Sequence, residues 1–236
     1  MSPISALTCV ALVTMLPGAT VAGQPPFELN VRHDRFVGGA RGTLVVDQAG
    51  VEFRTPTRNE SRRWDYSALK QVRILSPTRI ALDTYEDQGI LHLGRDRSFA
   101  FDVTGTIPGD LVAFLLARID RPIVTAVMPP LPPTPQSRAA VKNARIGRGS
   151  EGVLLLYETG LAYVTEREGD ARFWRFRDLY GVLMLDQYRL EVLGYEGPSG
   201  ATRPFVFELK EALPPGMFDA LWQRVNAPVR KEGLPE

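Results

Sequence analysis

The sequence has one cysteine and two histidines among its 236 residues. Cys9 lies within the first 23 residues, so a chain cut behind that segment has no disulfide, thiolate ligand or thiol nucleophile. His33 and His92 lack the spacing of a metal-ligand pair, although a two-histidine site between them stays open as an alternative. The HExxH, GxSxG, Walker A and CxxC patterns are all absent. These absences favour a protein that is not an enzyme and holds no cofactor.

The chain also lacks an excess of charge of either sign. The net charge is +1, without the basic excess that nucleic-acid-binding domains carry, so we expect no nucleic-acid partner. The apolar content of 44% is ordinary and excludes a disordered chain. Composition therefore indicates a globular protein.

The first 23 residues contain no charged side chain. The apolar run 4–16 has the length of a signal-peptide core, and small residues at Ala22 and Gly23 suit a cleavage site. An uncleaved anchor or a buried first helix is the alternative, but the run falls short of the ~20 apolar residues that span a bilayer. We therefore predict an exported protein, periplasmic or secreted, with a signal peptide over 1–23.

The rest of the chain contains an internal duplication. Sliding it by 110 positions aligns 42–86 with 152–196 without a gap, and an offset of 106 aligns 99–122 with 205–228. Chance gives about three identities in a stretch as long as the first, and the sequence has many more. The identical pairs include Gly42/Gly152, Gly50/Gly160, Arg62/Arg172, Trp64/Trp174 and Glu86/Glu196.

Apolar residues alternate with polar ones through both copies, which predicts strands with one buried face. Gly50 and Gly160 lie between consecutive strands, where we expect tight hairpins with positive φ. The period then changes to that of an amphipathic helix between flanking prolines. The helical apolar positions are Val112, Leu115, Leu116 and Ile119 in one copy and Phe218, Leu221, Trp222 and Val225 in the other.

The expected fold class is mainly β (α+β), with two modules that each form a bent antiparallel sheet of six or seven strands closed by a C-terminal helix. The modules span 27–124 and 139–229, and a tail covers 230–236. The Pro-rich segment 125–138 between them favours a semi-rigid spacer, with a PxxP ligand as the alternative reading.

These features resemble the pleckstrin-homology-like (PH-like) superfold, including GRAM and bacterial PH modules. The resemblance is carried by the hairpin 42–53, by the stretch 63–72 and by its counterpart 174–182. Trp222 stands in the second helix, where eukaryotic PH domains typically have a tryptophan, while the first helix has Leu116. The resemblance suggests a lipid or small-ligand binder, whereas the repeat and the missing chemistry favour a binding or scaffolding role.

Two motifs that suggest ligands have structural interpretations. Gly147 to Gly152 matches GxGxxG, but a strand-like run follows it where a dinucleotide site needs a helix, so we interpret it as a turn. The duplicated Arg-x-Trp, at Arg62-x-Trp64 and Arg172-x-Trp174, has the residue types of a ligand-facing cation–π pair. Its tryptophans share the apolar phase of the strand, so we expect them in the core.

Basic residues near the first hairpin of each copy are the candidate ligand-binding residues, because some PH domains bind inositol phosphates there. They are Arg32, Arg35, Arg41, Lys142, Arg145 and Arg148. The alternative is a solvated polar sheet edge. The leading hypothesis is a non-catalytic binding or scaffolding protein of the cell envelope that recognises a protein or peptide. The others are an anionic lipid or small-ligand binder, and an enzyme with an inter-module cleft.

Overall fold

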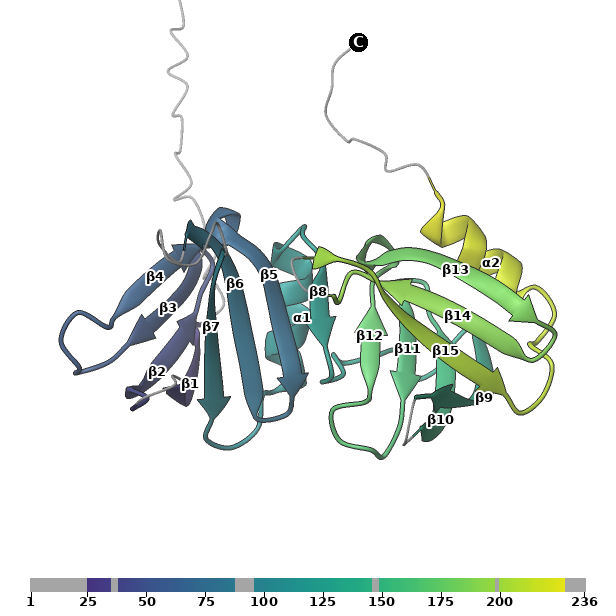
Figure 1. Ribbon diagram of the computed structural model, residues 1–236, viewed down its shortest axis with the longest axis horizontal. Helices are drawn as coiled ribbons and strands as arrows, with labels where there is room; N and C mark the ends of the chain where they lie inside the picture. Colours follow the sequence, from purple (N-terminus) through teal and green to yellow (C-terminus); the bar gives the residue numbers. More distant parts are fainter. Residues whose placement is uncertain (1–24, 35–37, 88–95, 146–148, 198–199, 228–236) are drawn as a thin grey trace, which may run out of the picture.

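The computed structural model describes residues 25–34, 38–87, 96–145, 149–197 and 200–227 (Figure 1). The predicted signal peptide, 1–23, and the tail, 230–236, lie outside the described residues.

The chain is mainly β, as the alternating pattern predicts. The first half contains β1 (Phe27–Asp34), β2 (Arg41–Val46), β3 (Gly50–Arg54), β4 (Arg62–Asp65), the 3-10 helix η1 (Tyr66–Ala68), β5 (Leu69–Ser76), β6 (Arg79–Asp87), β7 (Asp96–Val103), α1 (Gly109–Arg118) and β8 (Ile123–Thr125). The second half contains β9 (Ser137–Ala144), β10 (Ser150–Leu156), β11 (Leu161–Val164), β12 (Arg172–Trp174), η3 (Phe176–Asp178), β13 (Leu179–Asp186), β14 (Arg189–Gly194), β15 (Arg203–Leu209) and α2 (Met217–Val225). Figure 1 shows the two sheets next to each other, with α1 and β8 between them.

The two sheets share the order of their seven antiparallel strands, and the first sheet has one further strand, β8. The first has the order β4-β3-β2-β1-β7-β6-β5-β8, and the second has β12-β11-β10-β9-β15-β14-β13. The same cross-strand partners recur, since Leu82 faces Phe99 in one and Val192 faces Phe205 in the other. The register irregularities of the β5–β6 and β13–β14 pairs also fall at equivalent positions. The duplication in the sequence is therefore a duplication of strand pairing.

Each half has its own apolar core, built from the alternating positions that the sequence predicts. Leu44 and its counterpart Leu154 are both fully buried. The tryptophans of the Arg-x-Trp motif, Trp64 and Trp174, are 3% and 1% exposed, which confirms that they belong to the cores.

The duplicated glycines Gly50 and Gly160 allow the backbone of the neighbouring strand to approach closely. Neither has positive φ, so the expectation of positive φ at these hairpins is wrong. A Cβ on Gly50 would lie 2.1 Å from the carbonyl oxygen of Trp64, and one on Gly160 would lie 2.2 Å from that of Trp174. Any side chain here would push the neighbouring strand away.

An eighth strand, β8, departs from the expected six or seven antiparallel strands. It pairs in parallel with the edge strand β5, with Val72 beside Ile123 and Ile74 beside Thr125. The expected boundary between module and spacer, 124/125, thus falls within a strand. Three residues after Pro122 are too few to show a period, which is why the sequence did not reveal this strand.

The Pro-rich segment is packed, although the sequence suggested a spacer. Met128 and Leu131 contact the first core, and Pro129 is buried. The carbonyl oxygen of Met128 comes within 2.7 Å of where a Cβ on Gly109 would lie, so the segment crosses the start of α1 closely. This contact ties the connection to the first half.

The two helices differ in burial. Five residues of α1 are buried, whereas only Met217 and Leu221 of α2 are. Trp222 is 50% exposed although its predicted counterpart, Leu116, is 7% exposed. The prediction that Trp222 lies on the core-facing stripe is therefore wrong, because α1 lies between the two sheets and α2 does not (Figure 1).

The halves meet through residues that differ between the copies. Tyr157, Ala162 and Phe173, on the outer face of the second sheet, are buried in the first core. Their counterparts by the 110-residue offset are charged. Arg63 pairs there with Asp47 at 3.3 Å and with Glu52 at 3.2 Å, on an exposed face. The same sheet position is thus polar where solvent reaches it and apolar where protein covers it.

One buried arginine completes this interface. Arg175 donates from Nη1 to the carbonyl oxygens of Leu116 and Ile119, each at 2.6 Å. These carbonyls lie at the C-terminal end of α1, where a cation offsets the helix dipole. Arg175 also pairs with Asp178 at 2.7 Å, and Asp178 accepts a bond of 3.4 Å from the amide of Ile123. Burial raises the pKa of Asp178, and Arg175 opposes that shift.

Within the described ranges, no helix has the length and apolar character needed to cross a membrane.

Candidate functional site

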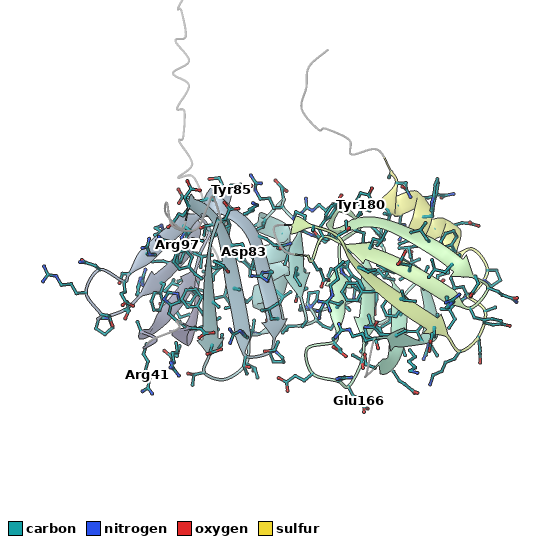
Figure 2. All side chains as sticks on the ribbon, in the orientation of Figure 1. Arg41, Asp83, Tyr85, Arg97, Glu166 and Tyr180 are labelled. Atoms are coloured by element: carbon teal, nitrogen blue, oxygen red, sulfur yellow. The ribbon has the colours of Figure 1, made fainter. Side chains whose placement is uncertain are left out.

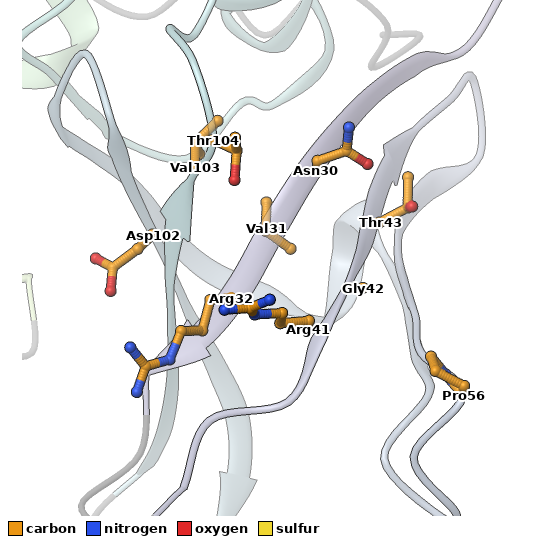
Figure 3. Close-up of a pocket in the computed structure, with 10 residues that line it drawn as sticks. All are labelled: Asn30, Val31, Arg32, Arg41, Gly42, Thr43, Pro56, Asp102, Val103 and Thr104. Carbon is orange, nitrogen blue, oxygen red and sulfur yellow. The ribbon is translucent and has the colours of Figure 1, made fainter.

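Two of the six predicted ligand-binding residues, Arg32 and Arg41, lie together in a groove of the first half. They are cross-strand partners on β1 and β2. The groove has a volume of about 730 Å³ (Figure 3). It is lined by Asn30, Val31, Arg32, Arg41, Gly42, Thr43, Pro56, Asp102, Val103 and Thr104. We call it the arginine groove.

The charges around the arginine groove leave it cationic. Its one acidic lining residue, Asp102, pairs with Arg79 at 2.9 Å. No described carboxylate lies within ion-pair distance of Arg32 or Arg41. An anion entering the groove would therefore meet two guanidinium groups that are able to donate charge-assisted hydrogen bonds.

The second half does not repeat this arrangement. Lys142 lies 3.6 Å from Glu208, and Arg145 pairs with the buried Asp170 at 2.7 Å. Glu151 stands in the place of Arg41, and Lys210, 2.7 Å away, lowers the pKa of its carboxyl. Arg35 and Arg148 lie outside the described residues. Of the four candidates that the structure describes, it thus brings two, Arg32 and Arg41, to one groove.

Of the two histidines of the alternative metal site, His92 lies outside the described residues. His33 is 7% exposed and lies among Phe53, Phe99 and Phe101, with ring centroids 5.9, 5.7 and 5.1 Å away. Among the described residues there is no group of three or more potential metal ligands.

The duplicated arginine, tryptophan and glutamate form the same three-residue cluster in each half. In the first, Glu86 accepts from Trp64 Nε1 at 3.0 Å and from Arg62 at 3.4 Å. In the second, Glu196 accepts from Trp174 Nε1 at 2.7 Å and from Arg172 Nε at 2.9 Å. Each arginine also lies over a phenylalanine ring, Phe99 or Phe205. These contacts satisfy the indole and link two strands, so the repeated residues have a structural role.

A second surface was not foreseen from the sequence. Seven large apolar side chains stand out as exposed among the described residues, and five of them lie on β13, in the turn after it and on α2. We call these five the β13 patch. They are Tyr180 (61%), Leu183 (46%), Leu185 (46%), Tyr188 (50%) and Trp222 (50%). In the view of Figure 2, Tyr180 and Arg41 lie on opposite edges of the molecule, so the patch and the arginine groove are separate.

A signal for this patch was present in the sequence. Comparing the copies position by position shows leucines at 183 and 193 where the first copy has Arg73 and Asp83.

The comparisons with known proteins give little. No protein-family model and no curated protein matches the chain. One solved structure that it resembles is described as the Spt16D Pob3N heterodimer, with 8% sequence identity and a TM-score of 0.29, over 72% of this chain and 84% of that one. A similarity at this level carries no argument about function.

Proposed function

We propose that the chain is a non-catalytic binding or scaffolding protein of the cell envelope, built from two PH-like modules. The observation that carries the proposal is the division between repeated and divergent residues. Repeated residues such as Trp64 and Glu86 build the strands and cores, whereas the outer faces differ between the halves. A duplicated frame with two different surfaces suits a protein that holds partners.

The PH-like assignment is supported by the order of elements. In each half, seven antiparallel strands form one sheet and are followed by a helix. The helix of each half contributes to that half's core, through Leu115 and Leu221. This is the organisation that the hairpin and Trp-containing motifs imply.

Export is the second element of the proposal, and it rests on the uncharged segment 1–23. Intact-mass measurement of the protein purified from its native cell tests it. We expect a chain that begins at Gly23 or Gln24 in the envelope or extracellular fraction. A full-length chain in the cytosolic fraction would contradict the assignment.

Site-specific cross-linking in the native cell tests the binding role. Photoreactive residues placed at exposed positions of either half should each yield a discrete adduct with a protein of defined mass. A matched photoreactive residue at buried Leu44 serves as the control, because it cannot reach a partner. If no exposed position gives an adduct above that control, the chain is not a protein-binding module.

A second candidate function, binding of anionic lipid headgroups or small anions, is favoured by the arginine groove. Flotation with vesicles that contain anionic lipid should recover the wild type at low salt and lose R32A/R41A. R138A/K142A removes two exposed cations from the second half and should behave as wild type. Competition by a soluble inositol phosphate would assign the groove to small anions. Equal flotation of the wild type and both variants would exclude this function for the arginine groove.

A further inference from the structure

At one position of the sheet, charged residues of the first half correspond to apolar residues of the second half, and the two sets differ in solvent exposure. Asp47, Glu52 and Arg63 form an exposed ion-pair network on the outer face of the first sheet. Their counterparts Tyr157, Ala162 and Phe173 are 5%, 0% and 3% exposed, because the first half covers them. The ion-pair network is thus absent from the half whose outer face is covered by the other half.

The same change occurs at a second place, and there no described residue provides the cover. Arg73 Nε lies 2.8 Å from Asp83, and Arg73 Nη2 lies 3.5 Å from Ser98 Oγ. In the second half these three positions hold Leu183, Leu193 and Pro204. Leu183 is 46% exposed. An exposed apolar cluster that replaces an ion pair marks an interaction surface.

No described strand pairs with the free edge of β13 beside this cluster, although α2 packs against β13 (Figure 1). In the first half, β8 adds to β5, and Ile74 is fully buried. Among the described residues, β13 pairs with β14 alone, and Met184, the counterpart of Ile74, is only half-buried. A strand edge with free backbone groups and flanking apolar side chains is a template for another strand.

We propose that the β13 patch is a docking edge for an extended, apolar, β-branched segment of a partner protein, which adds to β13 in parallel. The segment takes the place that Ile123, Val124 and Thr125 have beside β5, so its middle residue lies beside Leu183. This inference rests on the proposed binding function and names its site and the chemistry of its partner.

Two other occupants fit less well. Arg230 and Lys231 stand in sequence where the first copy has Val124 and Thr125, so this part of the chain does not offer the same apolar strand. A second copy related by two-fold symmetry would pair β13 with itself in antiparallel orientation, unlike the β5–β8 precedent. The precedent therefore favours a separate segment.

Selection from a displayed random-peptide library tests the proposal, with peptides at least as long as a typical strand of about six residues. The full chain is the target, and L183R/L193D is the counter-selection. This variant installs the ion pair that the first half carries at the same place, so it should keep the fold and the melting temperature. Y85S, which removes a 47% exposed apolar side chain from the first half, is the matched control.

We expect enriched peptides with β-branched residues at alternate positions, whose affinity falls about tenfold or more on L183R/L193D and stays unchanged on Y85S. Hydrogen exchange should show that a bound peptide protects the amides of 182–185 and leaves those of 72–76 unchanged. A photoreactive group at the N-terminus of the peptide should label the start of β13, as parallel pairing requires.

Other outcomes overturn the proposal. Peptides that bind both the wild type and L183R/L193D would place the binding site elsewhere and leave the binding function standing. A dimer in sedimentation that L183R/L193D dissociates would assign the patch to a second copy. Amides of 182–185 that lose protection when 229–236 are deleted would assign it to the chain itself. If no peptide is enriched and cross-linking in the cell also finds no partner, both proposals fail.

Discussion

Replacing Arg175 with methionine should uncouple the two halves, because this side chain makes three hydrogen bonds to the first half and two more to Asp178 beside it. Three go to the carbonyl oxygens of Leu116, Ile119 and Arg121, at 2.6, 2.6 and 2.9 Å. Two go to Asp178, each at 2.7 Å. The side chain of Asp178 is 1% exposed, so R175M leaves a buried carboxylate without its cation.

The expected cost follows from that geometry. Removing one partner of a buried ion pair destabilises a protein by about 3–5 kcal/mol. With an m-value of about 3 kcal/mol/M, the urea midpoint should fall by about 1–1.7 M. Fluorescence of the buried Trp64 and Trp174 reports unfolding of each half. R175M/D178N, which removes both charges, should recover about 2 kcal/mol of the loss.

The pH dependence gives an independent check. Burial raises the pKa of Asp178 above its value in the unfolded chain, and without Arg175 the opposing effect is gone. The folded variant then binds a proton more readily than the unfolded chain, so its stability is higher at acidic pH and is lost as pH rises. R175M should therefore approach wild-type stability as pH falls towards about 4. A loss below about 1 kcal/mol, or a deficit independent of pH, would refute the reasoning.

Three further changes test the fold. E196Q should cost about 3 kcal/mol and E86Q less than about 1 kcal/mol by urea unfolding, because Glu196 is 2% and Glu86 39% exposed. Equal losses would contradict this reading of the two clusters. G160A should lower the melting temperature by several degrees, since the Cβ would meet the Trp174 carbonyl at 2.2 Å; an unchanged melting temperature would leave the close approach without consequence. N143V should raise stability by about 1 kcal/mol, because the buried Asn143 side chain makes no hydrogen bond with any described residue; a loss on substitution would reveal a partner.

The sequence predicted what is local or repeated. The period of two places Leu44 and Leu154 in the cores, and the 110-residue offset predicts equivalent strands. Even the shift between register pairs, beside Leu69 and Leu179, recurs at that offset. Such features depend on neighbouring residues along one strand. Because both copies contain them, a single sequence is enough to recognise them.

The sequence did not reveal what depends on contacts between distant segments. The strand β8 has only three residues and pairs in parallel with β5, so neither length nor period marks it. The interface of the halves depends on Phe173 packing into the first core. No local sequence pattern distinguishes a buried outer face of a sheet from an exposed one. For the candidate site, the sequence identified Arg32 and Arg41, but ion pairs such as Arg145 with Asp170 could not be anticipated.

Repeated domains bury their neighbours' faces, and an outermost unit needs a polar outer face to stay soluble. The first half satisfies this requirement, because Asp47 and Glu52 both pair with Arg63 on its exposed outer face. The second half does not, because Leu183 and Leu185 are exposed beside an edge of β13 with which no described strand pairs. Each of these leucines is 46% exposed, so covering it would contribute about 1 kcal/mol, roughly half of the value for a fully exposed side chain. An array that is polar at one end and apolar at the other is what we expect if a segment of a partner protein joins at the β13 patch.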